Sequence, residues 1–275
     1  MQTLRRHRHR YLSLLFLCLS LATAMAAEAR DCKTLTATGN PEYPPYLWRM
    51  SADGDQLIGA IPRILEEIGE RIGVEINVIY TGPWSRAQQE VREGSVDLMA
   101  GAFFTVPRAQ WMDYIHPPFL ATNSVVWVRQ DNGFEYRQWD DLRPLNGVTV
   151  IHNSFGQSFD EFARQHLDLE TVRSVRQGFR MLRLGRVDYM LYEKNPAVVY
   201  SRQMGISDDV KPLSTAISSE PLHFAVSHES PCNTGALRGQ LVATVVSLID
   251  EGFIDRALRA ALEDTSELKQ LSSTN

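Results

Sequence analysis

Apolar residues in the first part of the chain follow two spacings, one typical of helices and one typical of strands. Residues 60–73 place aliphatic side chains three and four positions apart, whereas residues 74–80 alternate between apolar and polar positions. Short runs at 34–38 and 96–100 predict two further strands, and residues 84–93 predict a short helix. The pattern predicts strands that alternate with helices.

The same alternation returns in the second part of the chain. Further strands are expected at 147–151, 169–175, 187–192 and 222–226. Helices are expected at 155–166, 179–184, 196–204 and 237–262, the last as one long helix or two. Regular alternation of this kind predicts an α/β fold with largely parallel sheets.

Two strand–helix sets of about 100 residues each predict two lobes. The chain passes between them near 121–127 and again near 219–225. Two extended crossovers form a hinge, and a hinge between two lobes encloses a cleft for a ligand. We expect a discontinuous lobe 1 at 27–122 plus 224–275, and lobe 2 at 123–223.

The first 26 residues have the features of an export signal. Basic residues precede an apolar run at 11–22 that is too short for a bilayer, which takes about 20 residues. Small residues at Ala24 and Ala26 suit a signal peptidase. We expect a signal peptide, residues 1–26, cleaved near Ala26, and a mature protein in the periplasm. An uncleaved N-terminal anchor is the alternative.

Charge and cysteine content narrow the function further. The chain has 28 Lys and Arg against 33 Asp and Glu, and without residues 1–26 the net charge becomes −9. Such an acidic protein is unsuited to bind nucleic acid or an anionic membrane surface. Cleavage removes Cys18 and leaves Cys32 and Cys232, which favours one disulfide in an oxidising compartment, with two free thiols as the alternative.

No motif for metal or cofactor chemistry stands out. The chain lacks an HExxH motif, a Cys/His cluster, a GxxxxGK phosphate loop and a GxGxxG turn. We therefore expect no metal and no cofactor, and a soluble, monomeric protein with a small-molecule ligand.

A longer segment resembles a known family. Residues 99–119 read MAGAFFTVPRAQWMDYIHPPF, which is similar to the AGMTIT-x-x-R-x-x-x-x-DFS-x-PY stretch of the family 3 extracellular solute-binding proteins, the receptors of polar amino acid ABC importers. Residues 43–46 (YPPY), Gly59 and residues 185–188 (GRVD) match further family segments in order. The resemblance implies the two-lobed periplasmic binding protein type II fold, with two crossover hinge strands.

Arg108 is the first residue that the resemblance assigns to a ligand site. It lies three residues after Thr105, a good N-cap, so we expect it in the first turn of a short helix. A guanidinium binds a carboxylate through two parallel hydrogen bonds, and N–H groups from Gly101 onward would add to the site. In the family the matching Arg holds the ligand α-carboxylate. An exposed Arg after a capping Thr is the alternative.

Glu193 is the second residue that the resemblance assigns to a ligand site. It follows a strand that ends at Tyr192, and ligands bind at the carboxyl ends of parallel strands. The family has an Asp here, which accepts hydrogen bonds from the ligand ammonium, and the longer Glu can keep that role. A solvated Glu that pairs with Lys194 is the alternative.

The resemblance implies further wall and polar contacts. Tyr43 and Trp84 match aromatic walls, and we expect Tyr43, in a proline-rich loop, to stay outside the core, whereas Trp84 has a core position as its alternative. Asn153 and Ser154 offer polar contacts, with helix capping as the alternative. Phe103 replaces a Thr or Ser hydroxyl of the family, which argues against a standard amino acid as ligand.

The resemblance implies a periplasmic protein that captures a small polar, carboxylate-bearing solute, such as an amino acid or a related compound, and delivers it to an ABC transporter permease. Such a protein needs no catalytic residue. One alternative is an enzyme similar to the secreted cyclohexadienyl dehydratases, in which Glu193 would be the acid/base group. Another is a ligand sensor that acts on a separate receptor.

Overall fold

The computed structural model describes residues 32–50 and 54–272, with side chains to residue 264. The expected signal peptide and its cleavage site at Ala26 lie outside these residues. The chain divides into the units Met1–Cys32 and Lys33–Asn275, and the fold described below is that of the second. Cys32 and Cys232 are both disulfide-bonded. Across the described ranges, none of the helices combines the length and apolarity needed to cross a membrane.

The first lobe, which we define by β1, β5 and β6, alternates strands and helices as predicted. Its elements are β1 (Thr34–Thr38), α2 (Ala60–Ile72), β5 (Glu75–Val78), α3 (Trp84–Arg92), β6 (Leu98–Phe103) and α4 (Val106–Ala109). β1 pairs in parallel with both β5 and β6. Helix α2 buries Ile61, Ile64 and Ile68, the face that the apolar spacing predicted.

The second lobe, which we define by β9, β10 and β11, repeats the arrangement. It contains β9 (Asn146–Val150), α5 (Gln157–His166), β10 (Asp168–Val172), α6 (Val175–Arg183), β11 (Tyr189–Glu193) and α7 (Lys194–Gln203). β9 pairs in parallel with β10 and β11. Two apolar clusters, one around Phe179 and one around Phe159, fill its core.

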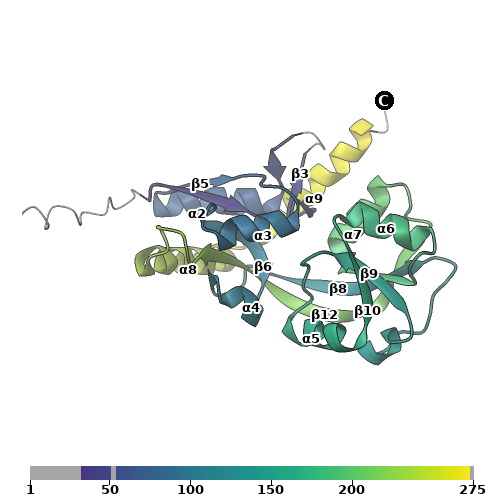
Figure 1. The fold of residues 1–275 in the computed structure, drawn as a ribbon. Coiled ribbons are helices and arrows are strands. Elements are labelled where there is room, and N and C mark those ends of the chain that lie inside the picture. Colours follow the sequence, from purple (N-terminus) through teal and green to yellow (C-terminus); the bar gives the residue numbers. More distant parts are fainter. Residues whose placement is uncertain (1–31, 51–53, 273–275) are drawn as a thin grey trace, which may run out of the picture. The chain divides into compact units, whose positions relative to one another are not determined.

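Two long strands join the lobes. β8 (Leu120–Arg129) and β12 (Val210–Ser227) run side by side and antiparallel (Figure 1). β8 also pairs with β11, and β12 with β6, so the strands of both lobes join in one sheet in the order β10-β9-β11-β8-β12-β6-β1-β5. The predicted two-lobed α/β fold with two crossovers is confirmed, while the exact lobe boundaries stay a prediction.

Several elements differ from the sequence prediction. β12 begins at Val210, well before the predicted 222–226, because its polar first half pairs along β8 and has no apolar alternation to reveal it. The strand expected at 169–175 ends at Val172, and α6 begins at Val175. The C-terminal helical region forms two helices, α8 (Gly235–Asp250) and α9 (Phe253–Ser272), separated at Gly252, which has a left-handed φ of 66°.

Short elements were missed altogether. A small sheet of β2 (Glu42–Tyr43), β3 (Leu47–Arg49) and β4 (Leu57–Ile58) occupies the proline-rich segment, and β7 (Met112–Tyr114) and the 3-10 helix η2 (Trp139–Leu142) complete the list. Strands of two or three residues are too short to show an apolar period.

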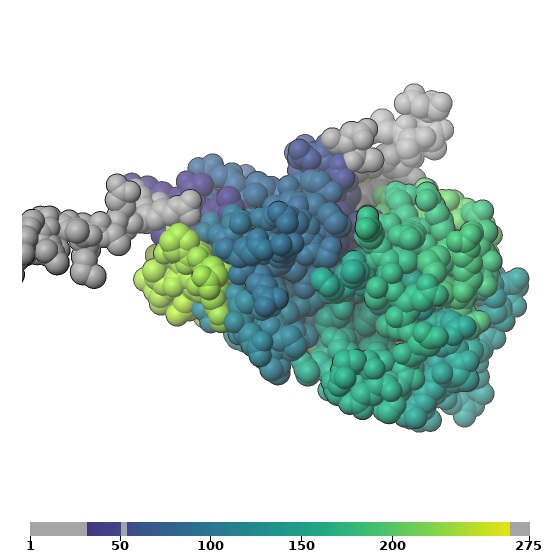
Figure 2. Space-filling view, in the orientation of Figure 1, coloured from purple at the N-terminus to yellow at the C-terminus, as the bar shows by residue number. Residues whose placement is uncertain are grey.

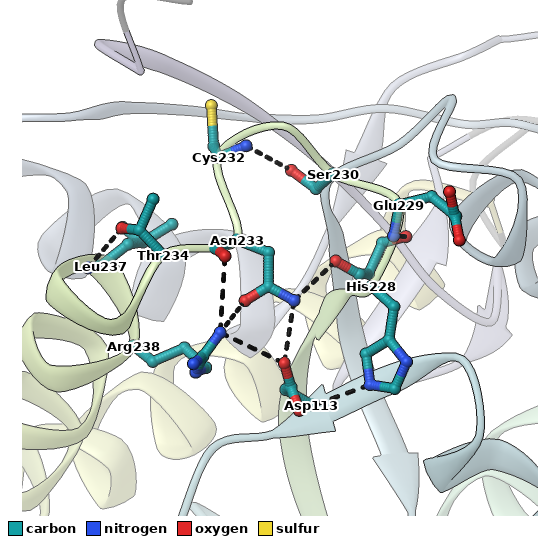
Figure 3. Close-up of polar contacts among 10 residues, drawn as sticks. Asp113, His228, Glu229, Ser230, Cys232, Asn233, Thr234, Leu237 and Arg238 are labelled. Carbon is teal, nitrogen blue, oxygen red and sulfur yellow. Dashed lines mark hydrogen bonds and ion pairs between the residues drawn. The ribbon is translucent and has the colours of Figure 1, made fainter. Parts of the chain in front are cut away.

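A polar network fastens the segment before α8 to the sheet. Asn233 Nδ2 donates to Asp113 Oδ2 at 2.9 Å and to Ser227 O at 2.9 Å, and Arg238 Nη1 donates to the same Asp113 oxygen at 3.2 Å (Figure 3). The Thr234 hydroxyl then accepts from Leu237 N and caps the helix. The network fixes where α8 begins.

Gly147 gives a direct test of the packing between β9 and β11. A Cβ at this position would lie 2.3 Å from Cζ of Tyr189, whose ring is fully buried. We expect Gly147→Ala to lower the free energy of unfolding by about 1–3 kcal/mol, because the core has to shift to admit the methyl group. Urea unfolding measures the change.

Gly239→Ala is the matched control. A Cβ there meets nothing within 4 Å, and the residue lies in the exposed part of α8. Alanine in a helix is favoured over glycine by roughly 0.5–1 kcal/mol, so this variant should be more stable than the wild type. Equal stability of the two variants would show that the described packing around Gly147 is wrong.

Candidate functional site

A small cavity of about 20 Å³ lies at the carboxyl ends of β6 and β11, beside the crossover strand β12. Its walls are Asn40, Tyr43, Trp84, Gly101, Ala102, Phe103, Arg108, Asn153, Ser154, Glu193 and Leu222. Ligand cavities usually measure roughly 300–1,000 Å³, so the walls of this one have to move apart before it can hold a metabolite. Figure 2 shows the blue N-terminal part and the green middle part of the chain in close contact, with a narrow furrow between them.

All eight residues that the sequence analysis expected to contact a ligand line this one cavity. They come from five separate segments of the chain, which the sheet order brings together. Asn40, Ala102 and Leu222 also line it and were not predicted. Ala102 and Leu222 are ordinary strand residues, and only their neighbours Gly101 and Phe103 gave a reason to look there.

A second, more open hollow lies elsewhere, over residues 136–140. It measures about 300 Å³, and the charged residues at its wall, Arg137 and Asp140, each pair with a neighbouring side chain. The smaller cavity differs because buried charges face it.

Arg108 is buried, with 7% of its surface exposed. The Thr105 hydroxyl accepts from Arg108 N at 3.3 Å, which confirms the predicted N-cap. Nη1 donates to Phe103 O at 3.3 Å and Nη2 donates to His152 O at 3.2 Å. Within the described part of the chain, no carboxylate forms an ion pair with this guanidinium.

Burial without an ion pair makes Arg108 electrostatically costly. Burial lowers the pKa of the guanidinium, while Tyr114, Asp160 and Glu193 oppose the shift. A buried cation with only neutral partners is stabilised when an anion joins it. The alternative of an exposed Arg is therefore wrong, and the position favours an anionic ligand group.

Aromatic rings surround this cation. Arg108 Cζ lies 5.4 Å from the ring centroid of Trp84, a cation–π contact. Trp84 is 6% exposed and packs in a core cluster with Ala87 and Val91. It is therefore a core residue and also part of the cavity wall. Phe103 presents an apolar ring where the family has a hydroxyl, and its carbonyl oxygen accepts from Arg108 instead.

Glu193 ends β11 and is 3% exposed. Burial raises the pKa of its carboxyl to about 7, against the opposing effects of its own backbone N–H, the nearby Asn153 amide and Arg108. Neither Glu193 Oε2 nor Asn153 Nδ2 has a hydrogen bond of good geometry to any described residue. The alternative of a solvated Glu is wrong. One buried acceptor and one buried donor remain available in the cavity.

Tyr43 and Ser154 differ from their expected environments. Tyr43 lies on β2 and is 5% exposed, so the proline-rich segment does bury it; its hydroxyl lies 3.4 Å from Thr122 Oγ1. The Ser154 hydroxyl donates to Asp160 and accepts from Gly156 N at 3.3 Å. Ser154 therefore supports the turn before α5 and has no proton left to donate to a ligand.

Metal chemistry has no evident site. The residues described contain no group of three or more His, Cys, Asp or Glu side chains placed to hold a metal ion. The cavity instead combines one cation, one acid and aromatic walls, which together suit an organic ligand with two poles.

The comparison with known families decides the relationship. The model of the bacterial extracellular solute-binding proteins, family 3, matches residues 35–265. The chain belongs to this family. Family 3 proteins bind solutes, and the solved structures that resemble this chain are mostly those of binding proteins. Among curated proteins, none matches this sequence.

Solved structures of low sequence identity share the fold of this family 3 protein. A histidine kinase sensor domain with similarity to periplasmic binding proteins has a TM-score of 0.71 at 21% identity, covering 84% of this chain and 96% of the other. AbpA from Streptococcus pneumoniae, bound to L-arginine, has a TM-score of 0.69 at 18% identity, covering 85% and 96%. Arginine-bound truncated ArgBP from T. maritima has a TM-score of 0.65 at 18% identity, covering 78% and 96%.

Glu193 predicts how stability depends on pH. Its pKa of about 7 lies above the ordinary value of 4.5, so its contribution to stability is present below about pH 4.5 and is lost as the pH rises through 7. We expect Glu193→Gln to be more stable than the wild type above pH 8, by up to about 3 kcal/mol, and equal to it below pH 4.5.

Urea unfolding across this pH range measures the difference, with protein refolded from denaturant to remove any bound solute. Glu170→Gln, on the exposed face of β10, is the control and should show no such pH dependence. A difference between Glu193→Gln and the wild type that stays constant with pH would show that Glu193 is not a buried acid.

Proposed function

We propose that this protein captures a small solute that carries a carboxylate and an amino group, and that it does so in the periplasm for delivery to an ABC importer. The observation that supports this most directly is the buried Arg108, which lines the same cavity as Glu193 Oε2. Among the described residues, Arg108 has no ion pair with a carboxylate and Glu193 Oε2 has no hydrogen-bond partner. A zwitterionic solute would pair with both.

The roles of the two charged residues follow from their chemistry. The guanidinium would bind the solute carboxylate in place of the carbonyl oxygens that it now contacts, since charge-assisted hydrogen bonds are roughly twice as strong as neutral ones. Glu193 would accept hydrogen bonds from the ammonium group of the solute. The positive charge of that ammonium would favour the ionised form of the Glu193 carboxyl. Asn153 would donate to a further acceptor of the solute.

The walls of the cavity limit the solute. Aromatic side chains at Tyr43, Trp84 and Phe103 favour a compact molecule with an apolar part. Delivery to a transporter is supported by the family, and by a neighbour of similar fold described as the substrate-binding protein of an amino acid ABC transporter.

Arg108→Ala tests the binding proposal. A thermal-shift screen of amino acids, organic acids and polyamines should find a carboxylate-bearing compound that stabilises the wild type by about 2.7 kcal/mol at 100 times its dissociation constant. The same compound should give no stabilisation of Arg108→Ala, and a much reduced one for Arg108→Lys, which keeps the charge but loses the fork.

Arg92→Ala, on the exposed end of α3, is the matched control and should respond as the wild type does. Full stabilisation of Arg108→Ala, or stabilisation of the wild type by polyamines alone, would contradict the carboxylate site.

One observation favours a second candidate, an enzyme on the same fold. A buried carboxyl with a pKa of about 7 is suited to give and take a proton near neutral pH. Incubation with prephenate or arogenate, followed by detection of an aromatic product, tests for the dehydratase activity. Loss of that product in Glu193→Gln would support this candidate, and no product from the wild type would reject it.

The structural neighbour from a histidine kinase supports a third candidate, a ligand sensor that acts on a separate receptor. The cavity would bind its ligand in the same way as in the importer proposal. The closed protein would then bind a receptor and not an ABC permease.

A further inference from the structure

Two side chains cross the boundary between the lobes in opposite directions. Glu42 lies on β2 beside the first lobe, and its Oε2 accepts at 3.0 Å from the backbone N–H of Val175, the first residue of α6 in the second lobe. Gln157 begins α5 in the second lobe, and its Oε1 accepts at 3.0 Å from the backbone N–H of Val106, the first residue of α4 in the first lobe. Each bond exists only while the lobes are together.

Both contacts complete a helix cap that the local sequence leaves incomplete. The first N–H groups of a helix have no partner within it. The local cap Ser174 accepts from Gln177 N at 3.2 Å, and Thr105 accepts from Arg108 N at 3.3 Å, so neither local cap serves the first N–H of its helix. The side chain from the opposite lobe supplies that missing acceptor.

The Glu42 contact belongs to a chain of hydrogen bonds that reaches the cavity. Tyr192 donates from its hydroxyl to Glu42 O at 3.0 Å, and Asn40 Nδ2 donates to that same hydroxyl at 3.2 Å. Asn40 lines the cavity, and its Oδ1 accepts from Glu42 N at 3.0 Å. Asn195 Nδ2 also donates across the boundary, to the hydroxyl of Tyr46 at 2.9 Å. Closure and cavity geometry are therefore linked on this side.

Further hydrogen bonds join the lobes on the side of the cavity where Gln157 lies. Gln88 Nε2 and Arg108 Nη2 both donate at 3.2 Å to the carbonyl oxygen of His152, which follows β9. Gln157 and Val106 are exposed, whereas Glu42 is half-buried and carries a carboxylate. A charged acceptor beside a helix N-terminus is the stronger of the two contacts.

We propose that Glu42 and Gln157 are positioning residues that hold the lobes closed over the cavity by reciprocal capping of α6 and α4. The inference deepens the proposed function and rests on it, because retention of a solute requires the lobes to stay closed. Two residues that do not line the cavity would thus set part of its affinity.

The test measures amide hydrogen exchange by NMR in the full mature chain, with no solute added. Glu42→Ala should raise the exchange rate by about five-fold or more at Val175, and also at Val106 on the far edge of the boundary, because loss of one cap shifts the lobes toward the open state. Gln157→Ala should raise both rates by a smaller factor. Glu42→Gln keeps an acceptor oxygen and should restore most of the protection.

Glu170→Ala is the control and should leave both amides unchanged. The proposal is overturned if exchange becomes faster only at Val175 in Glu42→Ala, or only at Val106 in Gln157→Ala. Either result would mean that the contact caps its own helix and does not hold the lobes together. Gln157 is exposed, so its variant carries the test if Glu42→Ala does not fold. The solute screen with Arg108→Ala is independent of these rates, so either proposal can fail without the other.

Discussion

The structure depends most on a buried guanidinium that forms no ion pair with any carboxylate of the described residues. Arg108 is held by the carbonyl oxygens of Phe103 and His152, one from each lobe, and by the ring of Trp84. These neutral partners accept its hydrogen bonds but do not neutralise its positive charge. Burial of such a cation in a protein interior is strongly unfavourable. The fold tolerates this because the missing anion can come from outside. Burial of Glu193 in the same cavity raises the pKa of its carboxyl to about 7, so a large share of it is protonated at neutral pH until a cation approaches.

The fold explains why these two residues meet. Each lobe pairs its own strands in parallel, and the antiparallel pair β8 and β12 joins the two sets into one sheet. Residues at the carboxyl ends of β6 and β11 line the same cavity. Arg108 follows the end of β6, and Glu193 is the end of β11. In the proposed mechanism the two crossovers form the hinge, and the bonds across the boundary favour the closed arrangement. A ligand that pairs with both charges therefore also favours the closed arrangement.

Sequence patterns predicted the parts of this account that depend on regular spacing. The apolar face of α2, the Thr105 cap and the strand before Glu193 all showed a period or a capping residue. The resemblance to the family named eight residues that all line the cavity, and their contact with a ligand stays a prediction. The polar first half of β12 and the two-residue strand β2 showed neither, so both were missed. Burial of Tyr43 was also missed, because packing between distant segments leaves no local pattern. The contact of Glu42 with α6 joins residues more than a hundred positions apart, which spacing cannot reveal.

A crystal structure with the solute identified by the screen would test the central claim most directly. The account predicts that a carboxylate of the solute accepts from the Arg108 guanidinium while a donor of the same molecule reaches Glu193 Oε2. A solute bound with its carboxylate elsewhere, while Arg108 still contacts only the Phe103 and His152 carbonyl oxygens, would contradict it.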